Sequence, residues 1–382
     1  MRVLVVSHTY ITPINRKKWQ MLATLFSDVN ITVLFPTRWG ATLFDHAVES
    51  DLSSFNSGNC SFIALEAFKT GNEVLYGYNP LKLVKLIRRL SPDIIHVEQG
   101  DNAFSYFQCI LFTKLLRLKS KILFFTWVNW KQKFSFKYKI FWRWLERFNL
   151  KYSNGAIVGN SGACGILRDK GFARKTFILP QLGVDTSVFT PVPREYAKLK
   201  KIGFVGRLVE EKGIFDLLEA FASLAEKFPD WQLVFIGRGP CAQQLKSRIS
   251  SMGIIDRISI EDTVPHDKVA LFIQNLEILV LPSYDVDGWR EQFGHVLIEA
   301  MACKVPVIGS DAGEIPSVIA GVGLVFNQKN KESLRKALCK LINDEILRME
   351  LGQRGYEKAI NEYSNQAIAK KTYNFWREIT KN

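Results

Sequence analysis

The chain has 382 residues, 47% of them hydrophobic and 23% charged, which are ordinary values for a folded globular protein and exclude a disordered one. This length exceeds the size at which a single hydrophobic core keeps growing, so we expect two domains. Of the net charge of +14, residues 1–190 carry +13, with 25 Lys and Arg against 12 Asp and Glu, whereas residues 191–382 have 26 against 25. This asymmetry favours a polyanionic partner for the first half: nucleic acid, an anionic membrane surface or a phosphorylated substrate.

The N-terminal segment MRVLVVSHTY predicts a strand and not a secretory signal, because polar residues resume too early. No uninterrupted apolar run approaches the roughly 18 residues of a spanning helix. The six cysteines are scattered without CxxC spacing, so we expect thiols in a reducing cytoplasm. Since no His or Cys cluster has metal-ligand spacing, we predict neither a structural zinc nor a dedicated catalytic metal, and no cofactor.

Short β-branched runs alternate with longer segments of helical period along the whole chain. In the first half we expect strands at 2–6, 31–35, 93–97, 122–125, 155–158 and 176–179, and helices at 81–90 and 104–118. After Pro191 and Pro193 we expect strands at 202–205, 232–236, 258–260, 278–281, 305–308 and 324–326, and helices at 214–227, 241–252, 266–274 and 331–342. Continuous apolar strands separated by helices predict two parallel-sheet α/β domains, 1–190 and 191–360.

Residues 343–382 have a helical composition and end with three aromatic residues among charges, Tyr373, Phe375 and Trp376. These aromatics need a surface to cover. We treat 361–382 as a separate C-terminal helix, which either docks back on the first domain or packs within the second.

The strand expected at 202–205 runs into the loop GRLVEEKG, residues 206–213. Its terminal glycines allow tight turns, and Arg207 and Lys212 place two cations beside a helix start at the carboxyl end of a strand. An open parallel sheet binds ligands there, and a diphosphate fits the charge. Two solvated surface cations are the alternative. The loop is neither a P-loop nor a GxGxxG fingerprint, which argues against an ATPase and a nicotinamide enzyme.

A second polar segment, residues 290–301 (REQFGHVLIEAM), contains two glutamates eight positions apart. A loop that bends at Gly294 and enters a helix leaves Glu291 near the helix start and Glu299 about two turns further on. His295 and Glu299, four residues apart, then share one face. The open helix start offers unpaired NH groups to a polar or anionic ligand.

The order GRLVEEKG, FIGRGP and PSYDVDGWREQFGHVLIEAMACKVPVIGSDAGEIPSVI resembles the C-terminal half of the retaining nucleotide-sugar glycosyltransferases of glycosyltransferase family 4. The resemblance continues in PDIIHVEQG and LPQLGVDTSVFTP, so it covers most of residues 90–330, and the paired glutamates match the family's EX7E motif. It implies the GT-B fold, in which two Rossmann-like domains face each other across a cleft. The first domain would bind the acceptor and the second the donor.

The resemblance also implies roles for single residues. Arg207 and Lys212 would hold the donor diphosphate and stabilise its negative charge as it leaves, and Glu291 would face the donor sugar. Glu299 would accept hydrogen bonds from the ribose hydroxyls. Further donor contacts would come from the turn and the helix start, namely Gly206, Gln292, Phe293, Gly294 and His295. His295 would contact the donor through its backbone, and the alternative is that its side chain acts as an acid or base.

The first domain departs from the family pattern in two loops. Residues 8–18 lack the glycine pair that many members have, and the strand ending at Thr126 is not followed by a histidine. Acceptor contacts are therefore not transferred from the family. The acceptor-side candidates are His8 at the end of the first strand, His96 after an apolar run, and Asn129 near the position of the missing histidine. For His96 a place at the rim of the sheet is the alternative, and for Asn129 a helix cap or turn.

Residues 131–151 combine seven basic residues with seven aromatic ones and a single acid, Glu146. A helix at a bilayer interface has this composition. A core helix with a solvated basic face and a nucleic-acid surface are the alternatives, and no recognition motif supports nucleic acid.

The resemblance implies a retaining transferase that moves a sugar from a UDP- or GDP-sugar to an acceptor hydroxyl. A glycan or lipid-linked acceptor, in cell-surface polysaccharide or glycolipid synthesis, would explain the basic first half. We expect it in the cytoplasm, with residues 131–151 as a contact to the inner face of the membrane. A catalytically silent GT-B protein that binds glycan or nucleotide is the alternative.

Overall fold

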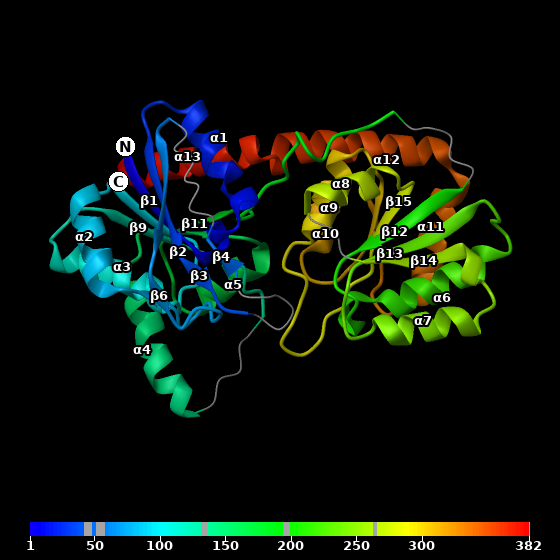
Figure 1. Ribbon diagram of the computed structural model, residues 1–382, viewed down its shortest axis with the longest axis horizontal. Helices are drawn as coiled ribbons and strands as arrows, with labels where there is room; N and C mark the ends of the chain where they lie inside the picture. Colours follow the sequence, from blue (N-terminus) through cyan, green and yellow to red (C-terminus); the bar gives the residue numbers. More distant parts are fainter. Residues whose placement is uncertain (42–47, 51–57, 131–135, 194–198, 263–265, 382) are drawn as a thin grey trace. The chain divides into compact units, whose positions relative to one another are not determined.

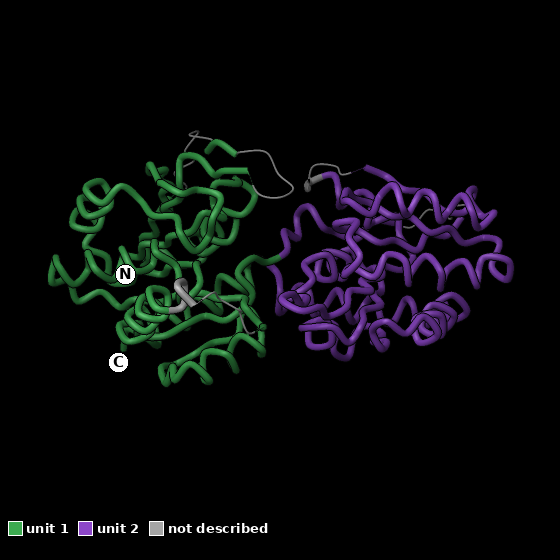
Figure 2. The backbone as a smooth tube through the Cα atoms, turned by 90° about the horizontal axis from the view of Figure 1, so that it is seen from below, with its two compact units in different colours: residues 1–183, 365–382 green, residues 184–364 purple. Residues whose placement is uncertain are grey.

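The computed structural model describes residues 1–41, 48–50, 58–130, 136–193, 199–262 and 266–381. The chain forms two compact units, Met1–Gly183 with Asn365–Asn382 and Val184–Ser364 (Figure 2). A parallel sheet is the centre of each unit, with helices on its faces (Figure 1). The prediction of two parallel-sheet α/β domains is therefore confirmed. The first part of the segment proposed to contact a membrane, residues 131–135, lies outside the described residues.

The sheet of the first unit has seven parallel strands in the order β11-β10-β9-β8-β1-β2-β5. They are β1 (Arg2–Val6), β2 (Asn30–Pro36), β5 (Cys60–Leu65), β8 (Ile94–Val97), β9 (Lys121–Thr126), β10 (Gly155–Val158) and β11 (Lys175–Ile178). The short pairs β3 (Arg38–Trp39) with β4 (Val48–Glu49) and β6 (Ala67–Phe68) with β7 (Gly77–Tyr78) are antiparallel. Strand β5 was not predicted, and it forms the edge of the sheet beside β2.

The helices of this unit are η1 (His8–Ile11), η2 (Pro13–Arg16), α1 (Lys17–Leu25), α2 (Pro80–Leu90), α3 (Phe104–Leu115), α4 (Phe136–Tyr152) and α5 (Ser161–Asp169). Helix α2 begins with Pro80 in its first turn, and the Asn79 side chain accepts a hydrogen bond from the Lys82 N–H. Helix α3 ends three residues before the predicted position, because Arg117 has a φ of 53°, outside the helical region.

The last helix, α13 (Asn365–Lys381), packs on the first unit. The Trp376 ring stacks on Trp19 of α1 with centroids 5.5 Å apart, and the Tyr373 ring stacks on Phe26 at 3.8 Å. Trp376 and Trp19 are both fully buried. Of the two alternatives for the C-terminal aromatics, the structure has the one in which they cover the first unit.

The sheet of the second unit has six parallel strands in the order β14-β13-β12-β15-β16-β17. They are β12 (Lys200–Val205), β13 (Trp231–Ile236), β14 (Ile258–Glu261), β15 (Ile278–Leu281), β16 (Val307–Ser310) and β17 (Leu324–Phe326). The helices are η3 (Glu210–Lys212), α6 (Ile214–Ala225), α7 (Ala242–Ser251), η4 (Ile255–Arg257), α8 (His266–Gln274), α9 (His295–Ala302), α10 (Ile315–Ile319), α11 (Lys331–Asn343), α12 (Glu345–Lys358) and η5 (Ala359–Tyr363).

The six cysteines are all free thiols, and Cys60, Cys109 and Cys303 are buried. Burial raises the pKa of the Cys109 thiol to about 12, which keeps it protonated and unreactive. Within the described ranges, no helix is both long enough and apolar enough to cross a bilayer.

Candidate functional site

The loop between β12 and α6 bears the two predicted diphosphate-binding cations and closes tightly on the neighbouring strand. Its last residue, Gly213, has a φ of 69°, a conformation that side chains disfavour. A Cβ atom on Gly213 would lie 2.0 Å from the carbonyl oxygen of Pro282, so only glycine fits here. The loop is therefore held against the carboxyl end of β15, and Lys212 lies directly beside that end.

Lys212 meets Glu291 at this point. The Lys212 Nζ lies 2.6 Å from the Glu291 Oε2, and the Ser283 Oγ donates to the same oxygen at 2.8 Å. The side chains of Lys212 and Glu291 are 14% and 9% exposed, so the pair is mostly buried but open to water on one side. The Lys212 ammonium also lies 5.0 Å from the centroid of the Trp289 ring. A cation and a carboxylate are thus concentrated where two parallel strands end.

Helix α9 begins where the sequence predicts, directly after Gly294. Gly294 occupies the N-cap with a φ of 80°, which turns the chain from the Glu291 loop into the helix. The backbone of that loop is fixed as well, because the Glu314 N–H donates to the Glu291 carbonyl at 3.0 Å. The NH groups of the first turn of α9 therefore start at the residues predicted to contact the donor.

Glu299 lies in the second turn of α9, as the spacing of the two glutamates predicts. Its side chain is half-buried, and burial raises the pKa of its carboxyl group to about 7. His295, at the start of the same helix, packs on Phe293 with ring centroids 5.0 Å apart. A carboxyl group that titrates near neutral pH suits a role as acceptor of hydroxyl hydrogen bonds when it is ionised.

Arg207 lies on the same loop as Lys212 but in a more open position. Its guanidinium lies 3.9 Å from Glu211, and its side chain is 41% exposed. The structure thus brings Lys212 and Glu291 into direct contact, and it places Arg207 beside Glu211 at the start of the loop.

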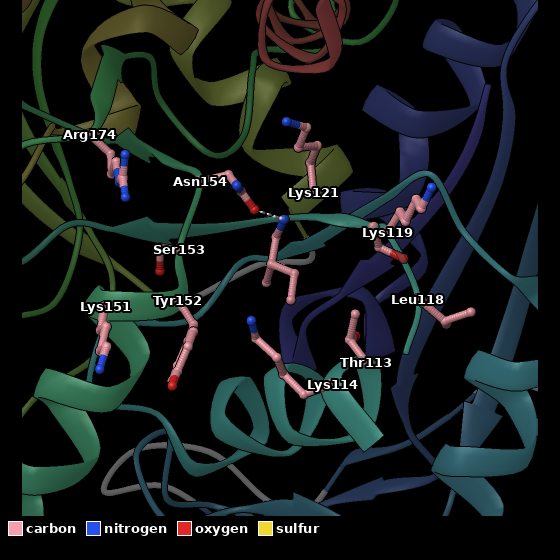
Figure 3. A pocket seen from close by; sticks show the side chains of 12 residues that line it. Thr113, Lys114, Leu118, Lys119, Lys121, Lys151, Tyr152, Ser153, Asn154 and Arg174 are labelled. Atoms are coloured by element: carbon pink, nitrogen blue, oxygen red, sulfur yellow. Dashed lines mark hydrogen bonds between the residues drawn. The ribbon is translucent and has the colours of Figure 1, made fainter. Parts of the chain in front are cut away.

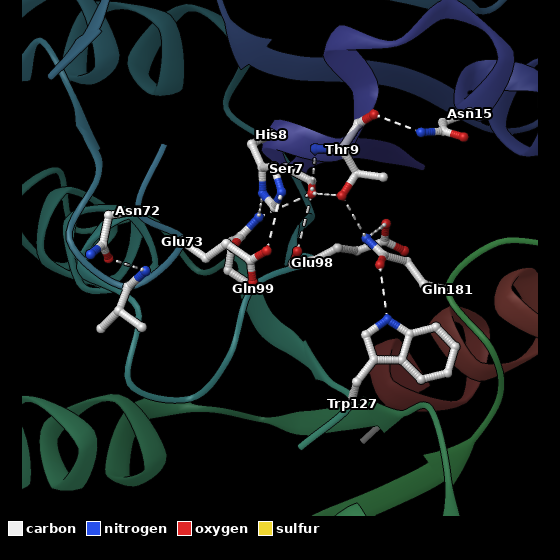
Figure 4. Close-up of polar contacts among 11 residues, drawn as sticks. Ser7, His8, Thr9, Asn15, Asn72, Glu73, Glu98, Gln99, Trp127 and Gln181 are labelled. Atoms are coloured by element: carbon white, nitrogen blue, oxygen red, sulfur yellow. Dashed lines mark hydrogen bonds and ion pairs between the residues drawn. The ribbon is translucent and has the colours of Figure 1, made fainter. Parts of the chain in front are cut away.

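The acceptor-side candidate His8 follows β1 at the carboxyl edge of the first unit's sheet. Its ring stacks on Trp39 with centroids 4.2 Å apart. Its Nδ1 is 2.6 Å from the Gln99 amide, and Figure 4 shows these two side chains together. The Nε2 lies 3.7 Å from Glu73. Burial lowers the pKa of His8, which keeps the ring neutral at physiological pH. A neutral imidazole at a sheet edge is suited to hydrogen bonding with a hydroxyl.

His96 is in the core and not at the rim of the sheet. It belongs to β8, is fully buried, and lies edge-on to the rings of Trp19 and Trp376 at 6.2 and 5.9 Å. Burial lowers its pKa to about 4. The tryptophan rings cover His96, so an acceptor cannot reach it. The prediction of His96 as an acceptor-side residue is therefore wrong.

Asn129 lies beyond the end of β9 and is 8% exposed. Its side chain packs on the first turn of α5, where a Cβ atom on Gly162 would lie 2.9 Å from the Asn129 Cβ. The cap of α5 is a different residue, Asn160, whose side chain accepts from the Ala163 N–H. Asn129 therefore lies at the carboxyl edge of the sheet without capping α5, and its acceptor role stays a prediction.

The structure shows a buried polar cluster in the first unit that the sequence interpretation missed. Lys18 and Glu98 form an ion pair at 2.7 Å with both side chains 2% exposed. The Lys18 ammonium also donates to the Gln181 carbonyl at 2.6 Å, and the Gln181 amide donates to Glu98 at 3.3 Å. The Tyr10 hydroxyl donates to the same carboxylate. This Lys18–Glu98 cluster ties together segments that follow three strands of the sheet.

A sequence signal for this cluster exists, although it is incomplete. Glu98 and Gln181 each follow an apolar strand, and polar residues in that position of a parallel sheet gather at one edge. Nothing in the sequence distinguishes Lys18 from its neighbours Arg16 and Lys17. The partner that neutralises Glu98 is therefore visible only in the structure.

The chemistry available in the second unit is electrostatic. A fixed cation, a carboxylate and an open helix start lie together, which suits a negatively charged leaving group and the hydroxyls of a sugar. In the part of the chain that the structure describes, no three His, Cys, Asp or Glu residues gather as metal ligands.

Comparison with known proteins gives a family for the second unit. Residues 188–358 match the family described as Glycosyl transferases group 1. The capsular polysaccharide biosynthesis glycosyltransferase CapM of Staphylococcus aureus is 31% identical over 183 residues, which cover 47% of this chain and 44% of CapM. The putative teichuronic acid biosynthesis glycosyltransferase TuaC of Bacillus subtilis (strain 168) is 32% identical over 179 residues, 47% of this chain and 42% of TuaC.

The chain thus spans about half the length of the curated relatives it matches. Among solved structures, Anabaena Alr3699/HepE in complex with UDP matches 99% of this chain and 100% of its own, with a TM-score of 0.72 and 14% identity. At that identity the likeness shows the fold alone.

Proposed function

We propose that the chain is a retaining glycosyltransferase with a nucleoside-diphosphate sugar as donor, because residues 188–358 match the family described as Glycosyl transferases group 1. The product is a glycoside formed at an acceptor hydroxyl. The observation that supports this most is the contact of Lys212 with Glu291, 2.6 Å apart at the carboxyl ends of the parallel strands.

In this proposal, Lys212 and Arg207 contact the donor diphosphate, and the helix start after Gly294 adds NH groups. The bond from the anomeric carbon to the diphosphate oxygen breaks, and its electron pair goes to the diphosphate, where the cations stabilise it. Lys212 exchanges part of its contact with Glu291 for the diphosphate. Glu291 is then available to the hydroxyls of the donor sugar.

The acceptor hydroxyl attacks the anomeric carbon from the face that the diphosphate leaves. A new bond forms between that carbon and the acceptor oxygen, and the acceptor proton passes to an oxygen of the departing diphosphate. No carboxylate of the protein forms a covalent intermediate. Glu291 acts as a positioning and electrostatic group, and Glu299 anchors the donor through the ribose hydroxyls.

The comparisons favour a class of donor and product without identifying either. Alr3699/HepE was solved with UDP, and the names of CapM and TuaC refer to capsular polysaccharide and teichuronic acid. We propose a UDP- or GDP-sugar as donor and a glycan or lipid-linked acceptor of a cell-surface polymer or glycolipid. His8 and Asn129 are the acceptor-side residues. The protein would work in the cytoplasm, with residues 131–151 as a peripheral contact to the inner face of the membrane.

A donor screen tests this function directly. Purified protein is mixed with UDP- and GDP-sugars, binding is measured by thermal shift, and sugar release or transfer is followed by mass spectrometry. Lys212→Ala and Glu291→Ala should each reduce turnover by roughly 100- to 1000-fold, because each removes an electrostatic contact to the reacting groups. Their circular dichroism spectra should match that of the wild type.

The matched control is Lys336→Ala, which removes the cation of an exposed ion pair with Glu332 in the same unit. It should leave turnover unchanged. Full activity in both site variants would overturn the assignment of the site. Nucleotide binding without turnover in the wild type would instead favour the silent binding protein.

A further inference from the structure

The first unit has a strongly basic cavity at the edge of the sheet opposite to His8. Its volume is about 290 Å³, and it lies where β9, β10 and β11 begin, between the ends of α3 and α4 (Figure 3). The strands of this sheet are parallel, so their amino ends share this edge, whereas His8 and Glu98 follow the carboxyl ends. The cavity is therefore separate from the acceptor-side residues.

Five cations line this cavity and no carboxylate does. The cations come from α3, the loop after it, the start of β9, the end of α4 and the segment before β11: Lys114, Lys119, Lys121, Lys151 and Arg174. Within the described residues, none of the five forms an ion pair with an acid. Four of the five side chains are exposed, and Lys121 is half-buried.

Two of these cations share one aromatic ring. The Lys114 Nζ lies 4.3 Å from the centroid of the Tyr152 ring, and the Lys151 Nζ lies 5.5 Å from it. Two ammonium groups beside a single ring repel each other, and an anion between them removes that repulsion.

The polar side chains of the lining make hydrogen bonds within the fold. The Asn154 Oδ1 accepts from the Ile122 N–H at 2.8 Å, whereas the Thr113 and Ser120 hydroxyls donate to backbone carbonyls. The hydroxyl protons are thus already used, and the donors and positive charge of the cavity come from its five cations. A group with several negative oxygens, such as a phosphate, matches this lining.

An apolar surface continues from the cavity along α4. The rings of Tyr152, Phe148 and Trp144 contact one another in steps of four residues, with centroids 4.7 and 5.6 Å apart. Trp144 and its neighbour Phe141 are each 53% exposed, and Leu115 at the end of α3 is 66% exposed. Exposed aromatic rings beside a basic cavity are the combination found where a protein contacts the acyl and headgroup layers of a membrane.

We infer that this cavity binds the phosphate of an anionic phospholipid headgroup, while Phe141, Trp144 and Leu115 enter the adjoining acyl layer. The inference extends the membrane contact proposed above from a basic segment to one site. It does not depend on the identity of the sugar or the acceptor.

The test compares two triple variants of the full chain on vesicles of phosphatidylcholine with and without phosphatidylglycerol. In the first, Lys119→Gln, Lys151→Gln and Arg174→Gln remove cations of the cavity. In the control, Lys85→Gln, Arg88→Gln and Arg89→Gln remove the same charge from exposed positions of α2, outside the cavity. At about 1 kcal/mol per cation, the cavity variant should bind anionic vesicles on the order of 100-fold more weakly than the wild type. The control should change less than about threefold.

An equal loss in both variants would show that diffuse charge, not a site, attracts the vesicles, and it would overturn the inference. Binding of inorganic phosphate by calorimetry, lost in the cavity variant while vesicle binding is unchanged, would overturn the lipid as the ligand. Donor hydrolysis without vesicles should equal the wild-type rate in both triple variants. Vesicle binding thus tests the lipid site, and donor hydrolysis tests the transferase assignment independently.

Discussion

Each unit places a Lys–Glu pair at the carboxyl ends of its parallel strands, and the two pairs differ in how they are enclosed. Lys18 and Glu98 are 2.7 Å apart with both side chains 2% exposed, and Lys212 and Glu291 are 2.6 Å apart with 14% and 9% exposed. The two ion pairs therefore have nearly the same N–O distance but differ in how far their side chains are buried. Tyr10 and Gln181 complete the contacts of the first pair, whereas the second has an open side.

The difference indicates different tasks. A buried ion pair that is fully hydrogen-bonded resists exchange, since removing one partner leaves a charge in a medium that solvates it poorly. A partly open pair exchanges its partner for a ligand at lower cost. We therefore expect the Lys18–Glu98 pair to hold loops of the first unit in place, and the Lys212–Glu291 pair to respond to the donor.

The largest expected effect tests this contrast through stability. Glu98→Ala leaves the Lys18 ammonium buried without its carboxylate and should lower the free energy of unfolding of the first unit by about 3–5 kcal/mol. Glu291→Ala should lower that of the second unit by only about 1–2 kcal/mol, because water reaches Lys212. Hydrogen–deuterium exchange of the β8 and β15 amides measures the two units separately. Equal losses of unfolding free energy in the two variants would show that the two ion pairs do not differ in their tasks.

Acidification should destabilise the first unit through His96. Its folded pKa of about 4 lies below the usual 6.5, so the unfolded chain binds the proton more readily between these values. Stability is therefore retained above pH 6.5 and falls as the pH drops towards 4, by about 3 kcal/mol in total. His96→Leu should lack this component when urea unfolding is measured across that range. An unchanged pH profile in this variant would contradict the enclosed position of the ring.

A smaller loss is expected from Tyr10→Phe, which removes one hydroxyl from the Glu98 carboxylate. A hydrogen bond to a charged group contributes about 1.5–3 kcal/mol, so the first unit should be destabilised by that amount. Tyr78→Phe is the matched control, because Tyr78 is also fully buried in this unit but contacts no carboxylate. Indistinguishable exchange rates for the two variants would show that Glu98 does not need the hydroxyl.

The smallest effect concerns donor binding and the pH. With a pKa of about 7, Glu299 is mostly ionised at pH 8 and mostly protonated at pH 6. If the ionised carboxylate accepts hydrogen bonds from the ribose hydroxyls, the KM for the donor should rise by at most about tenfold as the pH is lowered from 8 to 6. Glu299→Gln should flatten this dependence while kcat changes little. A wild-type KM that is constant over this range would remove Glu299 from the donor site.

Much of the fold follows from local patterns. The alternation of apolar runs and helical segments predicted twelve of the thirteen strands in the two large sheets, because strands covered on both faces are continuously apolar. Strand β5 was missed because its sequence, CSFIAL, has a single β-branched residue, and its burial is partial, as expected at the edge of a sheet. Strand β16 begins at Val307 and not at 305, because Pro306 has no N–H to donate to a neighbouring strand.

The site was predictable where it is local in sequence. Gly294 and the spacing from Glu291 to Glu299 predicted the start of α9, which the structure has after Gly294. The Lys18–Glu98 pair joins residues 80 positions apart, and no periodicity specifies which lysine reaches that carboxylate. His96 was misjudged because its enclosure depends on Trp376, a residue 280 positions later in the chain.

The stacking of Trp376 on Trp19 also orders events during synthesis. All seven strands of the first sheet have been made by residue 178, but the face of α1 around Trp19 and Phe26 stays uncovered until α13 emerges, almost 200 residues later. The first unit thus begins to be translated before the second, but its packing is complete only after the C-terminal helix has been translated. A fragment that ends at residue 183 should expose these rings and aggregate, and adding α13 as a separate peptide should restore its solubility.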